Sequence, residues 1–125
     1  MAGEKLSASA YDFSGEAWNE VEGLQVKLVG TADMSIRDVL SEFLASVHQR
    51  ALGDHVTEAT LDLRQLAFMN SACLKELAVW IGDIQELPAA DQYRIVLHSS
   101  PEILWQRRSM EALSRLGSDL VTIRV

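Results

Sequence analysis

The sequence predicts an α/β domain with a central, mostly parallel sheet of four to five strands, an antiparallel strand near the N-terminus and three to four packed helices. Three segments with helical periodicity alternate with short segments whose apolar residues recur at every second position. Strands that alternate with helices require right-handed crossover connections, which produce parallel pairing. The length of 125 residues and the 48% hydrophobic content fit one domain with one core.

The first strands are expected shortly after the N-terminus. Residues 1–10 are small and polar, so we expect them to be loose, with residues 11–125 forming the domain. Residues 11–13 and 24–29 alternate as half-buried strands do, with a turn at Glu22-Gly23 between them. This spacing predicts an antiparallel hairpin at the start of the domain.

The first helix is expected from about residue 36 to Gly53. Charged and polar residues occupy one face, and apolar residues recur at helical spacing on the other. The apolar set comprises Ile36, Val39, Leu40, Phe43, Leu44 and Val47. Gly53 is placed to end the helix, because glycine adopts the backbone conformation that helix ends require. Residues 59–63 then alternate as a strand does.

The second half of the chain repeats this pattern twice. Residues 71–87 predict a second helix, and residues 93–97 are typical of a strand. Ser100 and Pro101 predict the start of a third helix, because serine caps helices and proline fits the first helical position. This helix is expected to run to about Leu116 and to end at Gly117. Residues 120–125 predict the final strand.

Composition excludes several functional classes. The net charge of −7, from 18 acidic and 11 basic residues, argues against a sequence-independent nucleic-acid binder, which needs a basic face. No stretch approaches the ~18 apolar residues of a membrane span and no signal peptide is visible, so we expect a cytoplasmic protein without membrane contact. Cys73 is the only cysteine, and the histidines lack ligand spacing. We therefore expect no disulfide, metal or other cofactor.

The junction Asn70-Ser71 is the most informative feature for function. A hydroxyl at a helix N-terminus lies in a positive field, because the first backbone N–H groups are unpaired, and a phosphate is tolerated there. Helical spacing places Ser71 on the outer side near Lys75, an interval that favours an anion–cation contact. Val79 and Gly82 form an exposed surface beside it. The alternative interpretation is that Asn70 and Ser71 are ordinary helix caps.

Two other groups of residues offer competing interpretations. A lowered pKa near the helix N-terminus would make Cys73 a nucleophile or redox sensor. Its position on the apolar arc instead favours a buried structural role, and no nearby base is evident. Trp105, Arg107 and Arg108 mark either a solvated helix face with a half-buried tryptophan or a protein contact.

The order of elements and the segment Met69-Asn70-Ser71-Ala72-Cys73-Leu74-Lys75 resemble the STAS family, which includes the bacterial anti-sigma factor antagonists. The resemblance covers about residues 22–125. In that family an Asp-Ser pair begins the second helix and a Gly follows two residues later, whereas Asn70 and Cys73 occupy those positions here. Asn caps a helix about as well as Asp, so the helix start stays intact. A divergent branch with an Asn-Ser or Asn-Thr junction followed by Lys resembles this segment, and also residues 105–109.

The resemblance implies a non-enzymatic regulator controlled by phosphorylation, with Ser71 as the phosphoacceptor. Its implied partner is a GHKL-type serine kinase that doubles as the anti-sigma factor and binds only when Ser71 is unphosphorylated. A PPM-type Ser/Thr phosphatase would remove the phosphate. The residues expected to flank the phosphosite and contact the partner are Asn70, Ala72, Lys75, Val79 and Gly82. Two alternatives stay open: a constitutive interaction domain, and a small thiol enzyme or sensor that uses Cys73.

Overall fold

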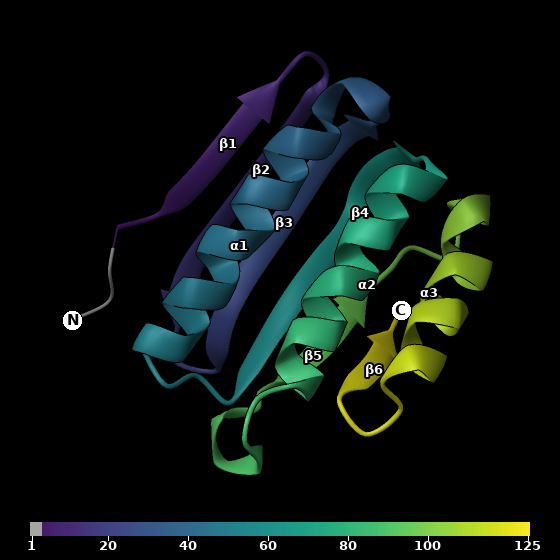
Figure 1. The fold of residues 1–125 in the computed structure, drawn as a ribbon. Helices are drawn as coiled ribbons and strands as arrows, with labels where there is room; N and C mark the ends of the chain where they lie inside the picture. Colours follow the sequence, from purple (N-terminus) through teal and green to yellow (C-terminus); the bar gives the residue numbers. More distant parts are fainter. Residues whose placement is uncertain (1–3) are drawn as a thin grey trace.

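The computed structural model describes residues 4–125, which form one six-stranded sheet with three α-helices (Figure 1). In chain order the elements are β1 (Leu6–Ala10), β2 (Phe13–Glu20), β3 (Gly23–Ala32), η1 (Met34–Ile36), α1 (Arg37–Gly53), β4 (Glu58–Met69), α2 (Ser71–Gln85), η2 (Ala89–Asp91), β5 (Arg94–His98), α3 (Leu104–Leu116) and β6 (Val121–Arg124). The strands lie side by side in sequence order. Strands β1, β2 and β3 pair antiparallel, whereas β3, β4, β5 and β6 pair parallel. The predicted α/β class with a mostly parallel sheet is confirmed.

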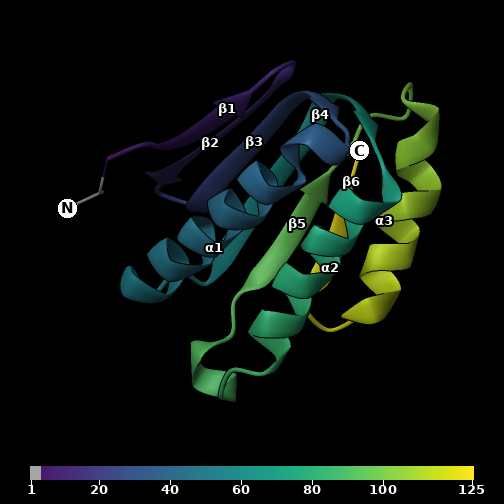
Figure 2. The same ribbon diagram turned by 45° about the horizontal axis from the view of Figure 1, so that its top comes forward.

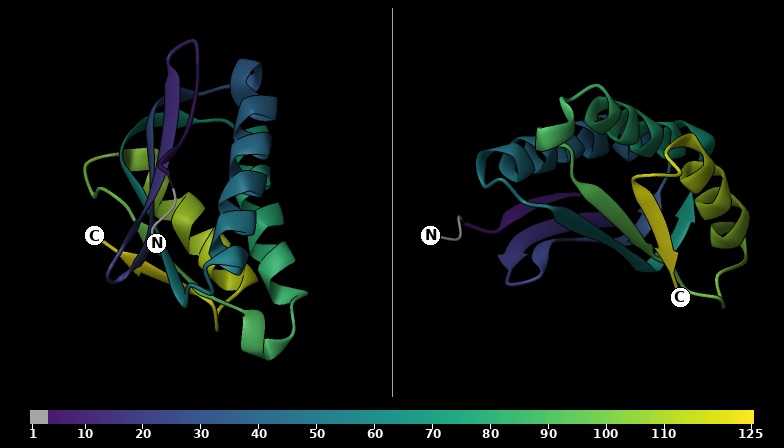
Figure 3. Two further views of the ribbon diagram at one scale, coloured as in Figure 1. Left: turned by 90° about the vertical axis from the view of Figure 1, so that its left-hand side faces the viewer. Right: turned by 90° about the horizontal axis from the view of Figure 1, so that it is seen from below.

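The three helices form one layer over a single face of the sheet (Figure 3). Helix α1 packs against β1, β2 and β3, and α3 packs against β6. Helix α2 lies between them in the layer and contacts both (Figure 2). The opposite face of the sheet carries no helix from residues 4–125. None of these helices has the length and apolarity that crossing a membrane requires.

Alternation along the strands directs one set of side chains into the core beneath the helices. The alternation predicted for residues 24–29 is present in β3, and β2 alternates in the same way. Together the two strands bury Phe13, Gly15, Ala17, Leu24, Val26 and Leu28. Gly15 lets α1 approach closely, because an added Cβ would lie 2.9 Å from Cε2 of Phe43. Helix α1 ends at Gly53, as its sequence predicts.

The N-terminal part of the sheet corrects two predictions. Leu6–Ala10 forms β1 instead of a loose end, and Tyr11-Asp12 is a turn instead of a strand, with Tyr11 at φ 53°. The sheet therefore has one strand more than the predicted range allows. Ala and Ser give a weak strand signal, but Leu6 and the alanines of β1 pack against the core while β2 supplies backbone partners. Residues 1–3, also predicted to be loose, lie outside the described residues.

The third helix begins later than Ser100-Pro101 predicts. Helix α3 starts at Leu104, and Ser100 instead stabilises a turn in which its Oγ accepts the N–H of Glu102 at 3.3 Å. The fully buried Gln106 explains this shift. Its Oε1 accepts the N–H of Ser100 at 2.8 Å, and its Nε2 donates to the carbonyl oxygens of Leu63 and Leu66 at 2.6 and 3.1 Å. These bonds attach the start of α3 to the end of β4.

A hydrogen-bond network joins α1, α2 and the start of β5. The hydroxyl of Tyr93, a buried residue, accepts from Nε1 of Trp80 at 2.8 Å. The same hydroxyl lies 2.6 Å from Nδ1 of His48, to which it donates when the imidazole is neutral. Burial lowers the pKa of His48 below its ordinary value of 6.5, although the charge of Asp83 acts in the opposite direction. The folded protein therefore favours neutral His48.

This network predicts that the free energy of unfolding decreases as the pH falls below about 6.5. The unfolded chain takes up a proton at His48 in that range, whereas the folded chain takes it up only at lower pH. Urea denaturation of the His48→Gln variant should show a flatter pH dependence between about pH 5 and 7. His98, whose pKa is also lowered by burial and by nearby arginines, should supply the remaining slope. Equal slopes for the two proteins would contradict this interpretation.

Candidate protein-docking site

The predicted junction between β4 and α2 forms at the expected residue. Asn70 is the N-cap of α2, with an extended backbone at φ −79° and ψ 172°, and its Oδ1 accepts the N–H of Cys73 at 2.9 Å. Ser71 is the first residue of the helix and is exposed to solvent. Within residues 4–125 its hydroxyl takes part in no side-chain hydrogen bond. The capping interpretation thus applies to Asn70 and leaves the Ser71 hydroxyl available.

The sheet holds this junction from its other side. The backbone N–H of Asn70 donates to the carbonyl oxygen of Ala32 at 2.9 Å, which extends the parallel pairing of Ala32 with Met69. Just beyond, Sγ of Cys73 donates to the carbonyl oxygen of Asp33 at 3.3 Å. The start of α2 is thereby fixed at the carboxyl edge of the parallel strands, where α/β proteins commonly place their binding sites.

The other predicted flanking residues on α2 differ in exposure, and Val79 and Gly82 lie about two and three turns along the helix from Ser71. Lys75 and Val79 are exposed, whereas Ala72 and Gly82 are half-buried. No atom lies within 4 Å of a Cβ added to Gly82, so the surface beside Val79 is open. The opposite face of α2 buries Cys73, Leu77, Trp80, Ile81 and Ile84. The helical spacing therefore assigned the inner and outer faces correctly.

An apolar rim that sequence analysis missed lies at the same sheet edge. It consists of Tyr11, Met34, Phe68 and Leu104, whose exposed fractions are 87%, 64%, 46% and 90%. Tyr11 lies in the β1–β2 turn, Met34 follows β3, Phe68 ends β4, and Leu104 begins α3. Each lies at or beside the end of an element, so no periodic pattern joins the four. We call these four residues together with Ser71 the docking edge.

Hydrogen bonds between segments bring the docking edge together. The backbone N–H of Thr31 donates to the carbonyl oxygen of Asp12 at 2.7 Å, which attaches the β1–β2 turn to the end of β3. Nε1 of Trp105 donates to the carbonyl oxygen of Ala67 at 2.9 Å, which attaches the start of α3 to the end of β4. Segments far apart in the sequence are therefore held beside the start of α2.

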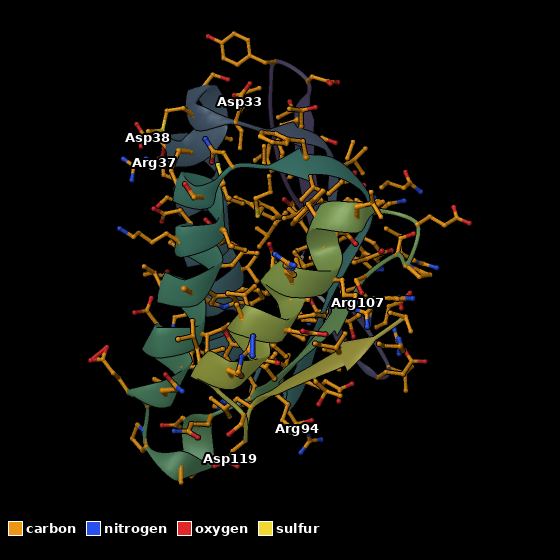
Figure 4. All side chains as sticks on the ribbon, turned by 90° about the vertical axis from the view of Figure 1, so that its right-hand side faces the viewer. Asp33, Arg37, Asp38, Arg94, Arg107 and Asp119 are labelled. Carbon is orange, nitrogen blue, oxygen red and sulfur yellow. The ribbon has the colours of Figure 1, made fainter. Side chains whose placement is uncertain are left out.

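Charged side chains surround the same end of α2 on its α1 side (Figure 4). The guanidinium of Arg37 lies 3.1 Å from a carboxylate oxygen of Asp38 and 3.3 Å from one of Glu76, so it joins α1 to α2. In the η1 turn that precedes α1, the carboxylate of Asp33 accepts the backbone N–H of Ser35 at 2.9 Å. Three carboxylates thus accompany one guanidinium next to the docking edge.

The environment of Cys73 argues against thiol chemistry. Its side chain is buried, with 0% of the residue exposed. Burial raises the pKa of the thiol, and the charges of Asp33 and Glu76 raise it further, while Arg37 acts in the opposite direction. A reactive thiolate needs exposure and a lowered pKa. Burial and a raised pKa both disfavour Cys73 as an enzyme nucleophile or redox sensor.

The basic-aromatic group on α3 forms no separate cluster. Trp105 is half-buried and uses its indole N–H to hold α3 against β4. Arg107 lies 3.8 Å from Glu111 one turn later, and Arg108 is exposed. This arrangement agrees with the simpler interpretation of a solvated helix face. Leu104, which precedes Trp105, is exposed on the same helix.

Residues 4–125 bring together no group of three side chains suited to a metal ion. The carboxylate of Asp62, on the open face of the sheet, is held by Arg64, whose Nε and Nη2 donate to it at 3.0 and 2.9 Å. Burial raises the pKa of Asp62, but these bonds and the charge of Arg64 outweigh it and hold the pKa below its ordinary value. A carboxylate paired in this way is a poor general base.

Comparison with solved structures finds a match along nearly the whole chain. The crystal structure of an anti-sigma factor antagonist from Mycobacterium paratuberculosis superimposes with a TM-score of 0.64, over 91% of this chain and 89% of that chain, at 17% sequence identity. The chain has the STAS fold. By sequence, no family model and no curated protein matches it. Within the STAS fold of this chain, Ser71 occupies the start of the second helix, where the sequence resemblance implies a phosphoacceptor.

The Asn70 cap predicts a specific pattern of stability. Asn70→Ala should lower the free energy of unfolding by about 1 kcal/mol, because the N–H of Cys73 loses its side-chain acceptor. Asn70→Asp is the matched control and should stay close to the native protein, because aspartate accepts the same bond. Urea denaturation followed by circular dichroism measures both variants. A loss of equal size in both would contradict the assignment of Asn70 as the cap.

Proposed function

We propose that this protein is a non-enzymatic regulator of the anti-sigma factor antagonist type, which binds a GHKL-type serine kinase or anti-sigma factor in the cytoplasm when Ser71 is unphosphorylated. The observation that carries the proposal is the Ser71 hydroxyl, which is exposed at the start of α2 and is not used as the cap. The apolar rim around it supplies a surface for a protein partner. The fold shared with an anti-sigma factor antagonist supports the same assignment.

In the unphosphorylated state, the apolar rim supplies the contact area. Exposed apolar residues that gather on one surface mark interaction sites more often than single exposed residues do. Burial of Tyr11, Phe68 and Leu104 against a partner lowers the free energy of the complex, because it removes their apolar surface from water. The acidic residues Asp33 and Asp38 beside the rim, and the net charge of −7, favour a partner whose contact surface is basic.

Phosphorylation of Ser71 changes the charge of the docking edge. The phosphate adds a charge of about −1.5 to −2 at neutral pH. The free N–H groups at the start of α2 and the ammonium of Lys75, four residues on, stabilise this charge within the chain. Docking would then bury a strongly hydrated dianion against the apolar rim, so desolvation and repulsion weaken the complex. Removal of the phosphate by a PPM-type phosphatase restores binding.

A constitutive interaction domain is the second candidate function. Its supporting observation is that the apolar rim is preformed by contacts that do not involve the Ser71 hydroxyl. In that case the docking edge binds its partner permanently and Ser71 is never modified. The two candidates differ only in the chemistry of one side chain, so the same purified proteins distinguish them.

Incubation with a GHKL-type serine kinase and ATP should add one phosphate to this protein, at Ser71. Mass spectrometry of the digested protein locates the modification. Ser71→Ala should abolish it, whereas Ser35→Ala should not, because Ser35 is a neighbouring exposed serine whose hydroxyl is bonded to Asp33. Phosphate on Ser35, or none at all, would favour the constitutive domain.

Partner binding should depend on one end of α3 and on the charge at position 71. Leu104→Ser should weaken binding at least about tenfold, or ~1.4 kcal/mol, because a 90% exposed leucine of the docking edge is lost. Leu116→Ser, a change at the opposite end of the same helix, is the matched control and should have little effect. Ser71→Ala should bind as the native protein does and Ser71→Asp should bind weakly. Isothermal titration calorimetry measures all four, and equal effects of the two leucine changes would exclude this docking edge.

A further inference from the structure

The sheet ends at two edges, β1 and β6, and β6 is protected against pairing with another strand. It spans only Val121–Arg124, and its first N–H, from Val121, already donates to the carbonyl oxygen of Gly117 at 2.8 Å. Arg124 places a charge on the same strand. Short strands and charged side chains are features by which proteins keep sheet edges from joining other chains.

Strand β1 is only one residue longer than β6, with five residues against four, but it lacks the charge. Its residues are Leu, Ser and Ala only, with no charge and no proline. It pairs with β2 without a bulge, from Leu6 opposite Ala17 to Ala10 opposite Phe13. Alternate residues of an edge strand direct their backbone N–H and C=O groups away from the sheet. β1 therefore offers a regular row of backbone donors and acceptors to another strand.

Two of the charged residues that flank β1, Lys5 and Asp12, are held toward the rest of the sheet. Lys5, just before the strand, has its Nζ 3.4 Å from Oε2 of Glu16 and 5.4 Å from the ring centroid of Trp18, both on β2. Asp12, just after the strand, accepts from the hydroxyl of Thr31 at 3.2 Å. Neither side chain is free to protect the edge of β1.

A groove beside β1 has room for further apolar side chains. It has a volume of about 250 Å³ and lies between β1 and α1. Its lining is Leu6, Ser7 and Ala8 on one side and Val39, Glu42, Phe43 and Ser46 on the other. Leu6 and Ala8 face the core side but are only half-buried. The reason is that β1 lies at the margin of the sheet (Figure 1), where α1 contacts it from one side and no further strand of residues 4–125 continues the sheet on the other. An added strand with its own helix would cover this part of the core.

We propose that a second copy of this chain pairs with this edge, β1 against β1, to form a symmetric antiparallel dimer. A two-fold axis perpendicular to the sheet brings identical edges together, so each backbone donor of one copy meets an acceptor of the other. The sheet continues across both copies, and both helix layers lie on the same face. The groove beside each β1 then faces the β1 strand and α1 helix of the other copy.

The flanking charges select the register of this pair. With the axis at Ser7, Lys5 lies opposite Ser9 of the second copy and no like charges meet. With the axis at Ala8, Glu4 would lie opposite Asp12 of the second copy, and like charges directly opposed across a strand pair are destabilising. The geometry therefore favours the register centred on Ser7.

The dimer is independent of the phosphorylation proposed above. Helices α2 and α3, which carry Ser71 and Leu104, lie on the other side of the molecule from β1 (Figure 1). Of the docking-edge residues, Tyr11 directly follows β1 and lies next to this interface, whereas Met34, Phe68, Ser71 and Leu104 belong to other elements and would stay accessible. The dimer would therefore engage a dimeric partner at two sites simultaneously.

Light scattering after gel filtration tests the proposal on the full chain. The native protein should have twice the protomer mass of 13.9 kDa. The double variant Ser7→Lys with Ser9→Lys should run as a single protomer with an unchanged circular dichroism spectrum, because a protective charge now lies on the edge. Thr122→Lys places the same charge on β6 and should leave the dimer intact. A monomeric native protein, or a dimer that survives the double variant, would overturn the proposal.

A cysteine introduced at the symmetry axis supplies a second measurement. Ser7→Cys should form a disulfide-linked dimer when a mild oxidant such as diamide accepts the two hydrogens of the paired thiols, because identical residues at the axis lie within disulfide reach. Cys73 is buried and should not react. Thr122→Cys, on the open face of β6, is the control and should stay largely uncross-linked. Preferential cross-linking through position 122 would assign the interface to β6 and refute pairing through β1.

Discussion

The candidate site depends on one residue, Asn70, which forms one hydrogen bond through its backbone and another through its side chain. Its backbone N–H continues the pairing of β4 with β3 at Ala32, and its side-chain oxygen caps α2 at the N–H of Cys73. The change from strand to helix is therefore confined to a single residue. Had Ser71 supplied the cap, its hydroxyl would accept a backbone N–H and lie over the helix end. Because Asn70 supplies it, the hydroxyl faces solvent at a fixed position.

The one-sided helix layer leaves two surfaces of different physical character. At the carboxyl edge of the parallel strands, turns and helix starts expose the apolar rim around a charged junction. At the β1 edge, small side chains expose the backbone itself. The first surface suits side-chain recognition, which a phosphate would disrupt through desolvation. The second suits strand pairing, which a phosphate at Ser71 would leave unchanged because α2 lies away from β1 (Figure 1).

Prediction from sequence succeeded where burial of one face gives the apolar residues a regular spacing. It was wrong where a single tertiary contact determines the conformation of a segment. The inner faces of α1 and α2 follow from apolar spacing, as do the alternating residues of β3. The start of α3 does not, because Gln106 bonds Ser100, Leu63 and Leu66 and holds the preceding segment as a turn. Propensity favours a helix from Pro101, but one buried amide with several partners outweighs it.

The sequence by itself determined the α/β class, the inner faces of α1 and α2 and the residue at which α2 begins, because each is encoded locally in periodicity and capping chemistry. Only the tertiary structure decided that Leu6–Ala10 is a strand, because β2 must be present to pair with so weakly apolar a segment. Only the tertiary structure assembled Tyr11, Met34, Phe68 and Leu104 beside Ser71. Those residues lie at the ends of separate elements, and the parallel pairing of the strands brings these ends to one edge.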